Sequence, residues 1–142
     1  MNYQSNNKYP IPKVERPNPE YAKILLNAFA GPISEDTAIN LYLYQSLSTN
    51  NTNPEFANIM KKISEVEMHH LYLLGQIIVL LGANPIYGNF GKDNILRLWD
   101  SSNVNYTTNF KDILETNIIA EQEAINYYRE LLKEINDQYI QT

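Results

Sequence analysis

Two side chains that are able to bind a metal ion, Glu67 and His70, lie three residues apart at the start of a long apolar stretch. On a helix this spacing places them one turn apart on the same side, so that both can reach a common point. The same helical face carries the apolar residues Ile63, Leu74, Ile77 and Leu81. Glu65 and His69 fall on a more polar face, and we expect Glu65 to be solvated and His69 to lie at the solvent or an interface without binding metal. The pattern therefore predicts that Glu67 and His70 point inward.

Two more glutamates occupy similar positions elsewhere in the chain. Glu121 lies in the middle of an apolar stripe near the end of the sequence, and Glu35 begins the corresponding stripe of an earlier segment. An ionised carboxylate that is buried alone is strongly unfavourable, so it needs a cation, a proton or strong hydrogen-bond donors. The lysines and arginines do not follow these stripes. A bound cation is the simplest explanation, and a hydrogen-bonded core pair without metal is the alternative.

The segments that contain Glu35 and Glu121 also resemble each other. Both read Glu-x-x-Ala-Ile-Asn-x-Tyr, and five of the eight positions are identical. The shared pattern predicts two helices that face one site with related geometry. Their last residues, Tyr42 and Tyr128, should lie about two turns from the carboxylates. They either donate hydrogen bonds to the site, as residues next to metal ligands often do, or pack as ordinary core aromatics.

Capping signals and apolar periodicity divide the rest of the chain. Residues 1–17 are polar and contain three prolines, which predicts an extended arm. A helical domain should follow over residues 18–142, because Asn-Pro pairs and a serine mark helix starts. The expected helices span about residues 19–30, 34–48, 54–81 and 108–136. Turn formers dominate between them at residues 83–107, and no segment alternates like a strand, so the predicted class is all-α.

Composition excludes several classes of protein. The chain has 142 residues, no cysteine and a net charge of −5. Disulfides, zinc-thiolate sites and thiol catalysis are therefore ruled out, and the acidic balance disfavours nucleic acid as a partner. No signal peptide is evident, and the longest apolar stretch is shorter than the roughly 20 residues of a membrane span. We expect a cytoplasmic protein that does not enter a membrane.

The pattern formed by Glu35, by Glu67 and His70 in Glu-x-x-His spacing, and by Glu121 resembles the ferritin-like superfamily. The rubrerythrin-like members are the most similar, and the manganese catalases are similar more distantly. The phrases AGPISEDTAI and EVEMHHLYLLG carry much of the likeness, which extends from about residue 9 to residue 140. The resemblance implies an up-down helical bundle with a long crossover between bundle helices 2 and 3. It also implies a carboxylate-bridged pair of iron or manganese ions.

The sequence departs from this family pattern near its end. Family members take a second Glu-x-x-His from the fourth bundle helix, but this chain has no histidine outside positions 69 and 70. The fourth helix is therefore expected to be truncated or absent. Four ligands remain where a two-metal site needs six, so the site is expected to hold one ion, or two incompletely. Three explanations stay open. Either the gene product has lost its last helix, or the chain is a fragment, or a neighbouring subunit completes the site.

Two functions follow as expectations, and the sequence does not decide whether the chain is an enzyme. The first is a metal-binding oxidoreductase that acts on peroxide, oxygen or iron at the carboxylate site. Without a cysteine-based redox domain, any electron donor would have to be a separate protein. The second is a degenerate, non-catalytic member of the family whose main property is self-association. A homodimer is expected in either case, because a missing bundle helix leaves an apolar groove. A membrane-surface or helix-binding adaptor is disfavoured by the acidic balance.

Overall fold

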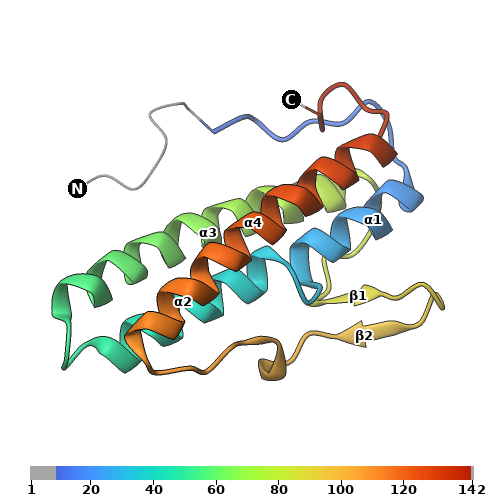
Figure 1. The fold of residues 1–142 in the computed structure, drawn as a ribbon. Coiled ribbons are helices and arrows are strands. Elements are labelled where there is room, and N and C mark those ends of the chain that lie inside the picture. The colour runs from blue at the N-terminus through green and yellow to red at the C-terminus, as the bar shows by residue number, and fades with distance from the viewer. Residues whose placement is uncertain (1–8, 142) are drawn as a thin grey trace.

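The computed structural model describes residues 9–141, which form four α-helices and one small hairpin (Figure 1). The helices are α1 (Pro19–Ala30), α2 (Glu35–Thr49), α3 (Pro54–Leu80) and α4 (Phe110–Glu134). The predicted all-α, ferritin-like class is confirmed. The expected arm over residues 1–17 lies partly outside the described residues, and residues 9–17 contain no helix or strand.

The helices begin where the sequence offers capping side chains. Asn18, Ser34, Asn53 and Asn109 each accept a hydrogen bond from a backbone N–H in the first turn of the helix that follows. These bonds satisfy donors that have no partner within the helix. Proline occupies the first position of α1 and of α3, where its missing N–H costs nothing.

Helices α2 and α3 pack closely against each other through small polar residues. The Ser46 hydroxyl donates to the Ala57 carbonyl at 2.6 Å, and the Ser64 hydroxyl donates to the Ile39 carbonyl at 2.9 Å. Both serines are buried, so these bonds satisfy polar groups that water cannot reach. The two helices therefore form a well-defined frame for the side chains between them.

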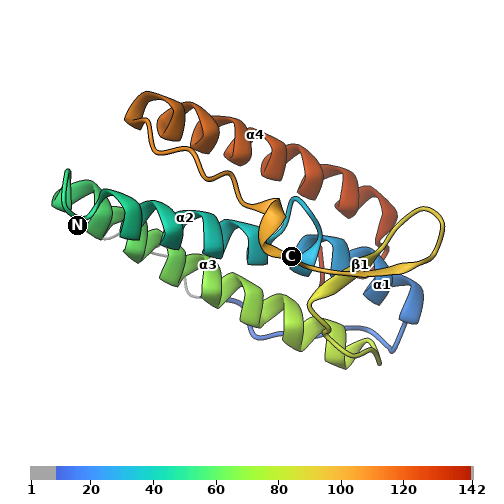
Figure 2. The ribbon, with the colours of Figure 1, turned by 90° about the horizontal axis from the view of Figure 1, so that it is seen from below.

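Helix α4 runs along the α2–α3 pair (Figure 1 and Figure 2) and contacts α3 through the rings of Phe110 and Phe56, whose centroids are 5.0 Å apart. It is joined to α2 by a reciprocal pair of amide hydrogen bonds. Gln45 Nε2 donates to Asn117 Oδ1 at 2.7 Å, and Asn117 Nδ2 donates to Gln45 Oε1 at 2.9 Å. Gln45 has no exposed surface, so the pair fixes the register of the two helices.

The core forms two clusters of buried apolar side chains. The larger cluster joins α1 to the ends of α3 and α4 and contains Ala22, Leu25, Leu26, Phe29, Ala30, Ile78, Leu81 and Ile135. The smaller one lies between α2 and α3 and contains Leu41, Tyr42, Met60 and Val104. Both clusters flank the middle of the bundle, where the candidate metal ligands lie.

The long connection contains two short strands that no alternation in the sequence indicates. Strands β1 (Gly88–Phe90) and β2 (Leu96–Leu98) form an antiparallel hairpin in the long connection, and a 3₁₀-helix (Ser101–Asn103) follows. Three residues are too few to show the alternation by which a strand is recognised in a sequence. Beyond the hairpin, Trp99 Nε1 donates to the Thr37 hydroxyl at 2.9 Å, which attaches the connection to α2.

Candidate metal centre

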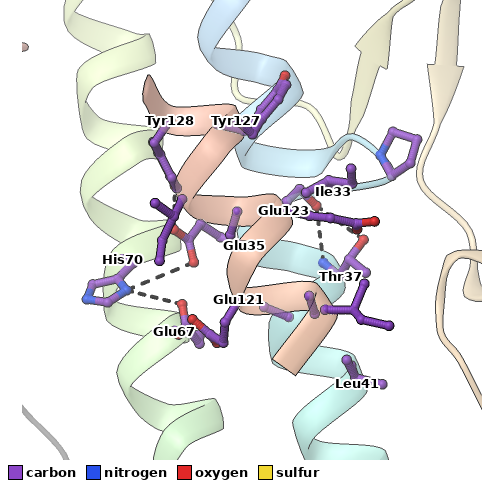
Figure 3. A pocket seen from close by; sticks show the side chains of 18 of the residues that line it. Ile33, Glu35, Thr37, Leu41, Glu67, His70, Glu121, Glu123, Tyr127 and Tyr128 are labelled. Carbon is purple, nitrogen blue, oxygen red and sulfur yellow. Dashed lines mark hydrogen bonds and ion pairs between the residues drawn. The ribbon is translucent and has the colours of Figure 1, made fainter. Parts of the chain in front are cut away.

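Three of the four predicted ligands meet at one point in the bundle (Figure 3). Glu35 is the first residue of α2, whereas Glu67 and His70 lie in the middle of α3. One ligand atom from each residue lies within 4.8 Å of the others. His70 Nδ1 is 3.1 Å from Glu67 Oε2 and 4.0 Å from Glu35 Oε2. The helical spacing of the Glu-x-x-His pair therefore brings both side chains towards Glu35 on the neighbouring helix.

The donor set and its spacing fit a single divalent ion. Carboxylate oxygens together with one imidazole suit manganese and iron in their divalent states. At a metal–ligand distance of about 2.2 Å, two donor atoms of one ion lie at most about 4.4 Å apart. The observed limit of 4.8 Å exceeds this by a few tenths of an ångström, a gap that side-chain rotation can close.

Burial makes the protonation of the two carboxyl groups unequal. Burial, the hydrogen bond with Glu67 and the negative charge of Glu67 raise the pKa of Glu35 from 4.5 to about 9. Burial alone would also raise the pKa of Glu67, but hydrogen bonds with His70 and Glu35 lower it below its usual value. At neutral pH Glu35 therefore keeps a proton that it shares with ionised Glu67. A bound cation can replace that proton.

Glu121 does not belong to this three-residue cluster. It is exposed on α4, and Tyr42 donates a hydrogen bond to its Oε1 at 2.5 Å. Its charge nevertheless contributes to the raised pKa of Glu35, so it lies close enough to be felt there. Glu121 lines the same cavity as Glu35 and Glu67, but its side chain is more exposed than a residue on an enclosed stripe would be. The same side exposes Leu114 and Ile118 of the helix.

The two tyrosines of the repeated segments form crossed hydrogen bonds. Tyr42 of α2 donates to Glu121 of α4, and Tyr128 of α4 donates to Glu35 of α2. Each repeat therefore supplies a glutamate near one end and a tyrosine that reaches the glutamate of the other repeat. Burial, first of all, and the nearby glutamates raise the pKa of both tyrosines above its usual value. Both hydroxyls therefore stay protonated and act as donors.

A cavity of about 690 Å³ surrounds the cluster and runs along α4. Glu35, Glu67 and His70 line it together with Tyr42 and Tyr128. Glu123 and Arg129 of α4 and Asn103 and Asn105 of the connection also line it. The volume is sufficient for ions, water and small solutes to reach the carboxylates.

The family of manganese-containing catalases matches residues 2–89, which include the three clustered residues. The chain belongs to this family. This confirms the expected likeness to the ferritin-like superfamily. The family shown is that of the manganese catalases, to which the sequence pattern indicated the more distant resemblance. The likeness to rubrerythrins stays a prediction. Glu121 lies outside the matched segment.

Similar proteins agree with this assignment. A probable manganese catalase of Clostridium acetobutylicum is 28% identical over 145 aligned positions, which cover 90% of this chain and 64% of the relative. The chain thus spans slightly less than two thirds of that relative. The crystal structure of wild-type KatB, a manganese catalase from Anabaena, matches with a TM-score of 0.82 and 23% identity over 99% of this chain and 70% of the other. A second KatB structure, from Anabaena PCC7120, gives a TM-score of 0.77 at the same identity and coverage. At this identity, the likeness to KatB shows the fold.

Sequence patterns did not indicate every residue near the cluster. The ring of Tyr9 lies against both histidines of α3, although it belongs to a segment with no periodicity. Nothing in the spacing of residues 9–17 indicates this contact, because the path of an extended arm is set by where it is anchored.

Proposed function

We propose that Glu35, Glu67 and His70 bind a manganese ion and that this chain provides part of a dimanganese centre acting on hydrogen peroxide. The observation that carries the proposal is the convergence of the three ligand atoms within 4.8 Å in a partly buried, acidic setting. Manganese is preferred to iron because both the family and the curated relative are described by manganese. The chemistry of the ligands alone would accept either metal.

In this proposal Glu121 and the tyrosines serve the second half of the centre. Glu121 extends from α4 towards the cluster as a ligand for the other ion, and the hydrogen bond from Tyr42 holds its carboxylate. Tyr128 does the same for Glu35, so that each carboxylate presents its free oxygen in a defined direction. Four ligand side chains are fewer than two ions need, and the others come from another chain or from residues outside this sequence.

When bound, two manganese ions supply the two-electron exchange by which one peroxide is reduced to water and another is oxidised to oxygen. No separate electron donor is needed for this reaction, since peroxide is both oxidant and reductant. The residues of this chain bind the metal and keep charge balanced. Glu35 releases its proton when the cation enters, and the cavity admits a small uncharged substrate.

Manganese binding and activity can be measured separately. Titration with Mn²⁺, followed by the electron paramagnetic resonance signal of the free ion, should give about one tightly bound ion per chain. His70→Ala should abolish this binding, and Glu65→Gln, an exposed site on the same helix, should leave it unchanged. Oxygen evolution from peroxide should follow metal content. Fewer than one Mn²⁺ ion bound per chain by a wide margin, with no change in His70→Ala, would contradict the proposal. Tighter binding of Fe²⁺ than of Mn²⁺ would assign iron to the site instead.

The second candidate function is non-catalytic self-association. The observation that favours it is the apolar surface of α4, where six large side chains are exposed: Phe110, Leu114, Ile118, Ile119, Ile125 and Leu132. A symmetric homodimer would cover this surface twice, and a partner chain could also complete the metal centre. Sedimentation of the metal-free and manganese-loaded chain should show a dimer. A stable monomer in both states would exclude this role.

None of the helices that the structure describes is long and apolar enough to cross a membrane.

A further inference from the structure

We infer that Tyr9 is a positioning residue that holds the imidazole of His70 in the orientation required for metal binding. The inference deepens the proposed function and rests on it. The ring of Tyr9 meets that of His70 edge-on, with centroids 5.9 Å apart and an interplanar angle of 68°. It also lies over the ring of His69, with centroids 3.8 Å apart.

His70 needs such support because its side chain is 38% exposed, whereas those of Glu35 and Glu67 are 9% and 18% exposed. The second torsion angle of histidine is broad, so a partly exposed ring can turn its nitrogens away from the carboxylates. Glu67 contacts one edge of the imidazole through Nδ1. Tyr9 adds a contact from outside the cluster, and an edge-to-face pair of this kind favours one ring orientation.

The backbone around Tyr9 limits how far its ring can move. Tyr9 is followed by Pro10, and Pro12 comes two residues later. A residue before proline is confined to extended conformations, and proline fixes its own φ angle. The segment therefore behaves as a short, stiff arm, so its attachment further along the chain also constrains Tyr9.

That attachment is made to the turn after α4. The backbone N–H of Glu15 donates to Asp137 Oδ2 at 2.9 Å, and the backbone N–H of Gln138 donates to Glu15 Oε1 at 3.2 Å. Asp137 is 3% exposed, so it is a buried anchor. Lys13 adds a cation–π contact with the ring of Tyr139 at 4.4 Å. The arm is thus fixed at one end to the turn after α4 and contacts the α3 histidines at the other.

A purely structural reading is that Tyr9 only fastens the arm to α3. The two readings differ in what happens at His70. Fastening alone affects the free energy of unfolding, whereas positioning also affects which imidazole nitrogen faces Glu67 and how tightly Mn²⁺ binds. Tyr9→Phe keeps the ring and should behave like the wild type. Tyr9→Leu keeps apolar contact with α3 but loses the edge-to-face pair, and Ile11→Ala is a control in the same arm, at a residue that is 90% exposed.

The experiment combines Mn²⁺ titration with nitrogen-15 NMR of the imidazoles in the metal-free chain. Only two histidines are present, so His69→Gln assigns the signals. We expect the wild type and Tyr9→Phe to show one dominant His70 tautomer, with the proton on the nitrogen that faces ionised Glu67. Tyr9→Leu should average the two tautomers and weaken Mn²⁺ binding by about three- to tenfold, the size expected for one aromatic pair. Ile11→Ala should change neither.

Two results would overturn the inference. One is a Tyr9→Leu variant with wild-type His70 signals and wild-type Mn²⁺ affinity. The other is an equal loss of affinity in Tyr9→Leu and Ile11→Ala, which would assign the effect to the arm as a whole. If the wild type binds no Mn²⁺, the proposed function fails. The NMR comparison in the metal-free chain then decides the inference about Tyr9 alone.

Discussion

Replacing Glu35 by glutamine should stabilise the metal-free chain more and more as the pH rises. Burial and the neighbouring Glu67 raise the pKa of Glu35 to about 9, from 4.5 in an unfolded chain. Between these values the folded chain keeps a proton that the unfolded chain releases, so the free energy of unfolding falls as the pH increases. Glutamine has the same shape and no proton to lose. Its amide can donate to Glu67 and accept from Tyr128.

The size of the effect follows from the pKa difference. One proton retained on folding changes the free energy of unfolding by about 1.4 kcal/mol per pH unit. From pH 5 to pH 7 the wild type should therefore lose about 3 kcal/mol relative to Glu35→Gln. Glu67 does not cancel this loss. Burial alone would raise the pKa of Glu67, but hydrogen bonds with His70 and Glu35 lower it. Ionised Glu67 therefore stabilises the fold at every pH above 4.5, and this stabilisation is lost only at more acidic pH.

Urea unfolding followed by circular dichroism at pH 5, 6, 7 and 8, with a chelator present, measures this difference. Glu65→Gln is the matched control, because Glu65 is exposed on α3 and lies outside the cluster. As the pH rises, the free energy of unfolding of Glu35→Gln should exceed those of the wild type and Glu65→Gln by a growing amount. Parallel curves for all three would show that Glu35 titrates as an ordinary glutamate, and the description of a buried, proton-sharing pair would be wrong.

Three other predictions concern metal binding and the bundle. Manganese binding should release a proton from Glu35, and its affinity should rise about tenfold per pH unit until the pH approaches 9, the raised pKa of Glu35. Calorimetry in buffers of different ionisation enthalpy measures the number of protons released. Gln45→Leu should lower the free energy of unfolding by about 1–3 kcal/mol in thermal denaturation because it leaves the Asn117 amide without its partner, and adding Asn117→Leu should recover part of the loss. Asn53→Ala should cost about 1 kcal/mol in urea unfolding, because α3 loses its N-cap, whereas Asn53→Ser should cost much less.

The sequence predicts the frame of this protein better than its surface. Helix starts are predictable because one side chain, such as Asn53, satisfies a local backbone donor whatever the rest of the fold does. The convergence of Glu67 and His70 is predictable for the same reason, since helical spacing alone puts them side by side. Their proximity to Glu35 depends on how α2 packs against α3, which local spacing does not predict. The Glu-x-x-Ala-Ile-Asn-x-Tyr repeat indicates only which helices share the site.

Exposure is the property that local pattern predicts worst. The stripe of α4 that contains Glu121 and Leu114 has the periodicity of a buried face, but both residues are exposed. Periodicity reports that a face is suited to burial and does not identify the element that covers it. The hairpin was missed for a related reason. The pairing of Gly88 with Leu98 depends on a turn around Asn94, whose positive φ of 62° is not evident from alternation.

The two halves of the candidate centre are held by different kinds of contact. Glu35, Glu67 and His70 belong to α2 and α3, whose backbones approach closely enough for buried Ser46 and Ser64 to bond across the interface. That frame brings the three candidate ligands together, and Tyr128 of α4 adds one hydrogen bond to Glu35. Glu121 depends instead on the crossed tyrosine bonds and the amide pair that link α4 to α2. A centre built in this way should keep its first ion when contacts of α4 are weakened and lose the second. In the proposed centre, the order of metal loss should therefore follow from which helices pack through buried, close contacts.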